Sequence, residues 1–439
     1  MDNENKGAWT SKIGFVLAAA GSAVGLGNLW RFPFTAANNG GGAFLLLYLI
    51  LVFTVGLTLL LLETGVGFRM RVNPVDAMKK INPHLGFIGS VGIFAVTVIF
   101  GFYSVVGGWI IHYLFLFVRH GLTESSATYF ENFIAQPVLP LVYTFAFLFV
   151  TAFIVYRGVQ EGIEKYSKIM MPLLFLLLIA LLVRSVTLPN AMEGLKFFLM
   201  PDFSKVNAMT FLAALGQTFF SLSLGMGIFI TYGAYLKEEE TFPIHLSMSV
   251  ICLDTLVSLL AGMMIFPAVF SFGLSINAGP TLIFITLPKI FADMPFGNIA
   301  AVVFFALLSL AAITSSISML EVSIAYLNDK YKVPRSKAVV GYTLLTVILS
   351  IPFSLSFGKW SDFKLTGRNL FDFADMVASN IFLPVGGLLL CIAVGWFYDA
   401  KKLRLFKSDK KNAFFAFAVK YLAPLAVIAV LIDSLGLLK

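Results

Sequence analysis

Eleven apolar stretches, each long enough to cross a lipid bilayer, follow one another along this 439-residue chain. A transmembrane helix needs about 20 mostly apolar residues, and only helices and closed barrels satisfy their backbone hydrogen bonds inside a bilayer. With 59% hydrophobic and 12% charged residues, the sequence predicts an all-α integral membrane protein with 11 transmembrane helices. We expect them at residues 13–37, 42–68, 85–118, 138–156, 167–183, 208–236, 243–272, 298–328, 338–357, 370–398 and 413–438.

Glycine and polar residues interrupt the first and the sixth of these stretches near their middles. The first interruption reads Gly21-Ser22-Ala23-Val24-Gly25-Leu26-Gly27-Asn28, and the second reads Ser221-Leu222-Ser223-Leu224-Gly225-Met226-Gly227. An interrupted helix leaves backbone groups unpaired, which costs several kcal/mol in lipid, so such backbone persists only inside protein or beside a cavity. Breaks at matching places in two halves point to the binding site of a transporter.

The two breaks divide the stretches into five, five and one. Because an odd number of helices flips the second copy, we expect two inverted five-helix repeats, with helices 1 and 6 unwound at mid-membrane. The expected organisation is a cytoplasmic N-terminus at residues 1–12, repeat one at 13–184, repeat two at 185–400, and a cytoplasmic loop with helix 11 at 401–439.

Basic residues are distributed unequally between the two sides of the membrane. Of the 31 Lys and Arg residues, 19 fall on the side of the N-terminus, 9 on the other side and 3 within spans. Since cytoplasmic loops carry the excess of positive charge, we expect the N-terminus in the cytoplasm and the C-terminus outside. The net charge of +8 is therefore a topology signal, and we expect an inner-membrane protein that binds no nucleic acid.

The first break can hold an anion and a cation together. Glycine at positions 21, 25 and 27 permits unusual backbone angles. Exposed carbonyls suit a cation such as Na⁺, and the N-terminus of the second half-helix favours a carboxylate. The alternative is a helix-packing face of the GxxxG type. The second break adds the hydroxyls of Ser221 and Ser223, which can instead bond to their own helix.

Charged and hydroxyl residues elsewhere in the apolar stretches extend this pattern. Asp254 lies deep in the seventh stretch, where an acid is costly unless a cation compensates it; a structural pairing with Lys is the alternative. The run Thr314-Ser315-Ser316 in the eighth stretch predicts a second cation site, or hydrogen bonds between helices. Arg31 could form an outer gate with Asp372 or Asp375, or simply reach toward the interface. We assign no role to Glu63 in a sodium site or gate, but in a proton-coupled carrier Glu63 and Asp254 could take protons.

The first break and the residues after it, Leu29-Trp30-Arg31-Phe32-Pro33 and Asn39-Gly40-Gly41-Gly42-Ala43-Phe44, closely resemble the neurotransmitter:sodium symporter family. The resemblance runs from about residue 9 to residue 399, and is greatest to bacterial eleven-helix members that carry aromatic or other hydrophobic amino acids. It implies the leucine-transporter-like fold of two inverted repeats.

The same resemblance implies the roles of individual residues. The first sodium site would comprise Ala23, Asn28, Ser221, Asp254 and the substrate carboxylate. The second would comprise Gly21, Val24, Ala311, Thr314 and Ser315. Substrate would contact Ala23, Gly25, Gly27, Ile99, Tyr103, Phe220, Ser223, Met226, Ser315 and Met319. The outer gate would pair Arg31 with Asp375, and the inner gate would pair Lys6 with Asp329, near Tyr235.

Three positions depart from the family pattern. Asp254 is Asn in many relatives, including chloride-dependent ones, so its carboxylate could replace chloride beside Tyr48, Gln217, Ser221 and Ser258. Met226 stands where the leucine-selective relative has Phe, and with Gly101 it could leave room for an aromatic ring. Lys6 stands where Arg is common, which loses a two-pronged fit to a carboxylate.

The resemblance therefore implies sodium-coupled symport of an amino acid, most readily tyrosine, tryptophan or phenylalanine, with two Na⁺ sites and no chloride. A proton-coupled carrier of the same fold and a receptor that binds amino acids without transporting them are the alternatives. No nucleophile–base pair or nucleotide-binding loop is visible in the sequence, so we expect no enzymatic activity. The sequence leaves the oligomeric state open.

Overall fold

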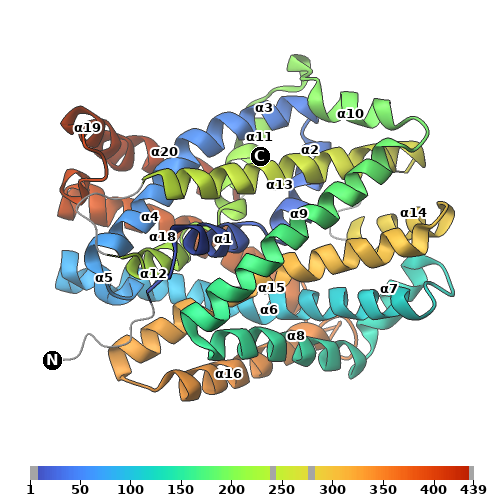
Figure 1. Ribbon diagram of the computed structural model, residues 1–439, viewed down its shortest axis with the longest axis horizontal. Helices are drawn as coiled ribbons and strands as arrows, with labels where there is room; N and C mark the ends of the chain where they lie inside the picture. The colour runs from blue at the N-terminus through green and yellow to red at the C-terminus, as the bar shows by residue number, and fades with distance from the viewer. Residues whose placement is uncertain (1–7, 238–243, 275–281, 435–439) are drawn as a thin grey trace.

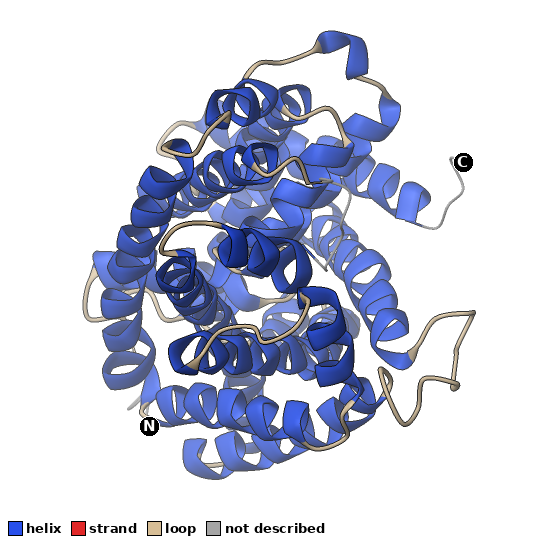
Figure 2. Ribbon diagram, turned by 90° about the vertical axis from the view of Figure 1, so that its right-hand side faces the viewer, coloured by secondary structure: helices blue, strands red, loops and turns tan. Residues whose placement is uncertain are grey.

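The computed structural model describes residues 8–237, 244–274 and 282–434, and helices are the only extended regular elements within those ranges (Figures 1 and 2). The first half contains α1 (Lys12–Ala23), α2 (Phe32–Asn38), α3 (Gly42–Leu51), α4 (Leu57–Met70), α5 (Pro74–Ile81), α6 (Gly86–Arg119), α7 (Ser126–Ala135), α8 (Leu139–Tyr156) and α9 (Lys165–Val186). The second half contains α10 (Ala191–Leu199), α11 (Ala208–Ser221), α12 (Ile228–Ala234), α13 (Ile244–Ser271), α14 (Leu287–Asp293), α15 (Gly297–Tyr331), α16 (Arg335–Leu355), α17 (Leu370–Val377), α18 (Leu383–Ile392), α19 (Asp409–Phe417) and α20 (Ala423–Ser434).

Short π-helical segments connect several of these helices into longer continuous helical runs. They include η1 (Gly27–Arg31), η2 (Val52–Gly56), η4 (Val159–Glu164), η6 (Leu282–Thr286), η7 (Ala378–Phe382), η8 (Ala393–Tyr398) and η10 (Ala418–Leu422). In the described residues, nine helical runs are long and apolar enough to cross a membrane, or ten if α1 and η1–α2 form one bent span. The predicted sixth span is divided between α11 and α12, and α11, at about 21 Å, is too short to cross alone.

The chain leaves the helical path at both interruptions found in the sequence. α1 ends at Ala23, Val24 is extended with φ −70° and ψ 101°, and the two halves meet at an angle of 50°. Between α11 and α12, the φ angles of Ser223, Gly225 and Gly227 are +50°, +83° and +73°. A Cβ atom on Gly225 would lie 2.3 Å from the carbonyl oxygen of Leu383, so only glycine fits there.

The interrupted helix α1 lies in the middle of the molecule, where it packs against α9, α13 and α15 (Figure 1). Its residues Ala18, Ala19 and Ala20 are nearly or fully buried, and small side chains allow close approach of neighbouring helices. The outer helices instead expose large apolar side chains, as expected for surfaces in contact with lipid, for example Phe149, Leu176, Ile348, Phe414 and Leu425. This arrangement places both breaks deep inside the protein.

Candidate functional site

A compact group of oxygen atoms surrounds the side chain of Asn28, which follows the first break. Asn28 Nδ2 lies 2.7 Å from Asp254 Oδ1, 3.0 Å from Ser221 Oγ and 2.8 Å from Ser258 Oγ. Ser221 Oγ in turn donates to the Asp254 carboxylate at 2.9–3.0 Å, and the Tyr48 hydroxyl lies 3.3 Å from Asp254 Oδ2. The structure thus brings together residues from α3, η1, α11 and α13.

The charge of this first oxygen cluster is not balanced by the side chains that form it. Asp254 and Asn28 are fully buried, and the hydrogen-bond partners of Asp254 in the described residues are the neutral Asn28, Ser221 and Tyr48. An isolated buried carboxylate is costly, so buried charges are normally paired or bind a metal ion. The cluster is therefore suited to a monovalent cation such as Na⁺.

A second oxygen cluster lies on the other side of the first break, around Ser315 of α15. Its hydroxyl is 3.4 Å from the carbonyl of Gly21, 3.2 Å from that of Ser22 and 3.3 Å from that of Val24. One hydroxyl proton can satisfy only one of these three carbonyls. The Thr314 hydroxyl lies 3.0 Å from the carbonyl of Ala311. This surplus of acceptors also fits a cation.

Between the two clusters, glycine keeps the backbone of the first break open. A Cβ atom on Gly25 would lie 2.5 Å from Ser315 Oγ and 3.5 Å from the hydroxyl of Tyr103, and one on Gly27 would lie 3.0 Å from the Phe220 ring. The buried Tyr103 hydroxyl makes no hydrogen bond of good geometry in the described residues, although the Ser315 hydroxyl and the backbone of Leu26 lie close to it. The apolar residues expected beside the substrate, Ile99, Met226 and Met319, are all at most 4% exposed.

The sequence model of the sodium:neurotransmitter symporter family matches residues 6–138 and 135–439, and so covers almost the whole chain. The chain belongs to this family. A sodium-dependent transporter of Bacillus subtilis is 40% identical to it over the full length of both proteins. The sodium- and chloride-dependent taurine transporter of Rattus norvegicus is 29% identical, with 90% of this chain and 72% of the relative covered.

A solved structure is also similar to this one. The crystal structure of MhsT in complex with L-phenylalanine matches with a TM-score of 0.89 and 40% sequence identity, over 98% of this chain and 100% of that chain. Together with the family match, this likeness establishes a multi-pass sodium-dependent symporter with the fold of a bacterial family member. The resemblance stated from the sequence is confirmed.

The expected outer gate is not an ion pair in this structure. The guanidinium of Arg31 lies 4.2 Å from the ring centre of Phe220, and Ser379 Oγ donates to the Asp375 carboxylate at 2.7 Å. Arginine stacks readily on aromatic rings, and Arg31 makes such a contact here. Of the two acids considered, Asp375 is the one whose charge acts on Arg31.

The expected inner gate is described only in part, because Lys6 lies outside the described residues. Asp329 accepts hydrogen bonds from the backbone and side chain of Asn73 at 3.1 and 3.3 Å. Tyr235 donates instead to Glu321, at 2.7 Å. The Lys6–Asp329 pair stays a prediction.

The expected contribution of Gly101 to the substrate pocket is wrong. A Cβ atom at this position would lie 2.9 Å from the ring of Phe353 and 3.3 Å from Leu349 Cβ, both on α16. Ile99 and Tyr103 lie four positions apart and share one face of α6, whereas position 101 points to the opposite face. Space for an aromatic ring of the substrate must therefore come from other positions, and Met226 is the one predicted from the sequence.

Two buried acids were not identified from the sequence. Both lie near the membrane side that the distribution of basic residues predicts to be cytoplasmic. Glu321 is fully buried and forms a bidentate ion pair with Arg335, while Glu164 accepts hydrogen bonds from Thr10 and Ser11 at the start of α1. The signal for Glu321 was its position in an apolar stretch, between Leu320 and Val322. The partner of Glu321 follows a turn, whereas Glu164 pairs with Lys168, four residues on, as well as with the distant Thr10 and Ser11.

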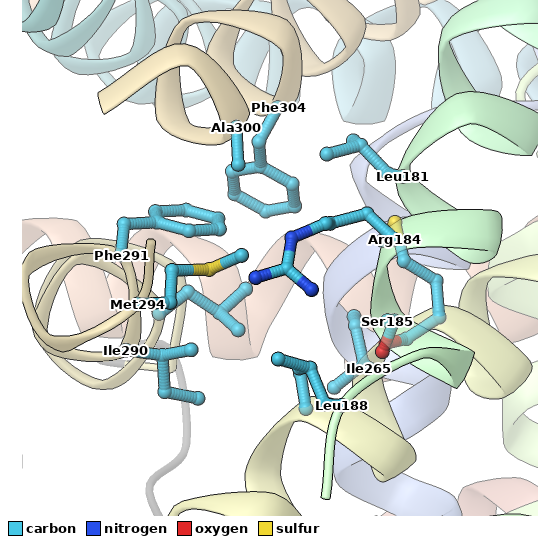
Figure 3. Close-up of a pocket in the computed structure, with 13 residues that line it drawn as sticks. Leu181, Arg184, Ser185, Leu188, Ile265, Ile290, Phe291, Met294, Ala300 and Phe304 are labelled. Atoms are coloured by element: carbon cyan, nitrogen blue, oxygen red, sulfur yellow. The ribbon is translucent and has the colours of Figure 1, made fainter. Parts of the chain in front are cut away.

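An apolar hollow of about 30 Å³ lies away from both breaks, between α9, α13, α14 and α15 (Figure 3). Figure 3 shows the guanidinium of Arg184 pointing into it among Leu188, Phe291 and Met294. Arg184 donates to the Thr187 hydroxyl and to the carbonyl of Pro295 at 3.2 and 3.3 Å. This volume corresponds to about one water molecule, so the hollow does not hold an amino acid.

Proposed function

We propose that the protein carries a hydrophobic amino acid, most readily phenylalanine, tyrosine or tryptophan, together with Na⁺ and without chloride. The observation that carries this proposal is the pair of oxygen clusters on either side of Gly25, one of them containing the uncompensated carboxylate of Asp254. An amino-acid substrate brings its own carboxylate to the exposed backbone of the first break, where a half-helix begins.

The proposed architecture is that of eleven membrane-spanning helices in two inverted repeats, at residues 13–184 and 185–400, followed by helix 11. The positions of the two breaks, in the first helix of each repeat, support it. We place the N-terminus in the cytoplasm and the C-terminus outside a bacterial inner membrane, on the basis of the distribution of basic residues.

The first sodium ion would be held by Ala23, Asn28, Ser221 and Asp254 together with the carboxylate of the substrate. Tyr103 would donate its hydroxyl to that carboxylate. Sharing one carboxylate makes ion and amino acid bind cooperatively, and each must raise the affinity of the other by the same factor. The second sodium ion would be held by Gly21, Val24, Ala311, Thr314 and Ser315.

The side chain of the substrate would lie among Ile99, Phe220, Ser223, Met226 and Met319. Methionine is flexible and polarizable and contacts aromatic rings favourably, so Met226 supports a preference for aromatic substrates. The L-phenylalanine in the similar structure of MhsT agrees with this choice. Alternating access would then close the Arg31–Asp375 side and open the Lys6–Asp329 side, after release of the second ion.

Chloride independence follows from the position of Asp254. The Tyr48 hydroxyl, Ser221 and Ser258 already surround a fixed negative charge, which leaves no need for a mobile anion at the same place. Replacing external chloride by gluconate should leave uptake unchanged, and abolished uptake would contradict this part of the proposal.

The substrate is tested by scintillation-proximity binding of a panel of labelled amino acids to the purified protein, in Na⁺ and in choline at the same pH. We expect binding of aromatic amino acids in Na⁺ only. Equal binding in choline would favour a proton-coupled carrier of the same fold, and binding without uptake into proteoliposomes would favour a receptor.

A further inference from the structure

Glu63, on α4, is a buried acid for which the proposed symport has no use. The residue is 1% exposed, and its Oε1 accepts a hydrogen bond of 2.6 Å from the backbone N–H of Gly225. Gly225 lies within the second break, directly before Met226. The other carboxylate oxygen, Oε2, is buried and makes no hydrogen bond of good geometry in the described part of the chain, although the backbone of Phe229 also lies close to the carboxylate. Such an oxygen is costly unless something binds it.

The carboxylate of Glu63 borders a small cavity of about 20 Å³ at the second break. This volume exceeds the 10–15 Å³ or so that one water molecule requires. The backbone carbonyl of Gly225 faces the same space, since its oxygen would lie 3.1 Å from a Cβ atom on Gly92 and 2.9 Å from one on Gly386, and both glycines line the cavity. The remaining wall is aliphatic or glycine: Pro74, Met78, Ile88, Gly89, Gly227, Ile230, Gly386 and Leu390.

None of the described residues that line this cavity is basic. Charged groups on the neighbouring elements make contacts with residues other than Glu63. On α5, Asp76 contacts Asn73 and Lys79, and Lys80 donates to the Met70 carbonyl. Farther away, Lys420 lies over Trp396, and Asp254 accepts from Asn28 and Ser221. The thiol of Cys391 on α18 lies within the electrostatic reach of Glu63 but carries no positive charge. Among the described residues, no basic side chain forms an ion pair with Glu63.

A metal cation does not fit this cavity. The space holds about one water molecule, and the carboxylate and one carbonyl offer fewer oxygens than the six or so that hard cations prefer. A proton needs neither volume nor further ligands, and buried acids in membrane helices often mark proton sites.

We propose that Glu63 is a proton-binding site, in which Oε2 takes up a proton that comes from hydronium in the bulk solvent and is relayed by a water molecule in the cavity, and later releases it to the solvent by the same route. Only an O–H bond forms and breaks, and no electron is transferred. Ionised Glu63 makes a charge-assisted bond to Gly225 that is roughly twice as strong as a neutral one. Protonation of Glu63 therefore weakens the hydrogen bond to Gly225 that holds the second break in place next to Met226. Any effect of this weakening on transport rests on the proposed function.

Infrared difference spectroscopy of the purified protein tests the site without any requirement for transport. The C=O stretching band of a protonated buried carboxyl should appear as the pH is lowered from mildly alkaline to mildly acidic. We expect Glu63→Gln to remove this band and Asp254→Asn to retain it. Glu161→Gln, which changes an acid whose side chain is 74% exposed, should leave the spectrum unchanged. A band that persists in Glu63→Gln overturns the proposal.

Gly92→Ala provides a second test that keeps the acid in place. The added methyl group takes space from the water molecule beside Gly225 O, so the pH midpoint of the band should shift relative to wild type. An unchanged midpoint overturns the role of the cavity. If the band behaves as expected while no amino acid binds in Na⁺, the proton site stands and the proposed symport fails.

Discussion

Asp254→Asn removes one negative charge from the first oxygen cluster and keeps the size of the side chain. In the structure this carboxylate is fully buried, and its partners are the neutral Asn28, Ser221 and Tyr48. Two unit charges about 4 Å apart at an effective dielectric constant of about 20 attract by about 4 kcal/mol. Since the amide still offers an oxygen ligand, we expect a net loss of about 2–4 kcal/mol, or a roughly 30- to 1,000-fold weaker affinity for Na⁺.

The assay is a sodium titration of labelled amino-acid binding to the purified variant, in chloride and in gluconate. Chloride should restore part of the lost affinity, because it can supply the missing charge beside Tyr48 and Ser258. Asp202→Asn, on an exposed acid, is the matched control and should titrate like wild type. A sodium affinity within about twofold of wild type, or variant binding that is indifferent to chloride, would refute the reasoning.

Three further variants test the breaks and the buried ion pair. Gly25→Ala should weaken amino-acid binding by more than about tenfold, since its Cβ would lie 2.5 Å from Ser315 Oγ. The control is Gly341→Ala at an exposed position, where no atom lies within 4 Å of the added Cβ, and this variant should bind normally. Gly225→Ala should lower the free energy of unfolding by about 1–3 kcal/mol, because φ is +83°, and an unchanged melting temperature would argue against the described break. Glu321→Gln should cost about 3 kcal/mol by leaving Arg335 without its partner, whereas Glu161→Gln, in the exposed pair with Lys165, should change thermal stability by less than about 0.5 kcal/mol.

Much of this fold follows from simple features of the sequence. Long apolar stretches predict the helices because a bilayer permits little else, and the glycines at positions 21–27 and 225–227 predict where the helices are interrupted. Asp254 was identifiable as a site residue because an isolated acid in an apolar stretch must have a partner. These inferences need only local sequence.

The contacts between distant segments could not be predicted in the same way. Glu63 stands six residues before Arg69 and could be taken for the end of a helix, whereas its partner Gly225 is 162 positions away. The hydroxyl of Tyr235 donates to Glu321, 86 positions away, a contact that nothing in the local sequence indicated. Gly101 was wrongly expected beside the substrate because residues two positions apart on a helix, such as Ile99 and Gly101, lie on opposite faces. Such features depend on how helices pack.

The central claim is that the two helix breaks hold the carboxylate of an amino acid directly beside a sodium ion. The dissociation constant of L-phenylalanine, measured at increasing Na⁺ at constant ionic strength and pH, tests it, with phenylalanine amide as the analogue that lacks a carboxylate. The account predicts that Na⁺ tightens binding of phenylalanine but not of its amide. A dissociation constant that is independent of Na⁺, or an amide that binds as tightly and with the same Na⁺ dependence, would contradict it.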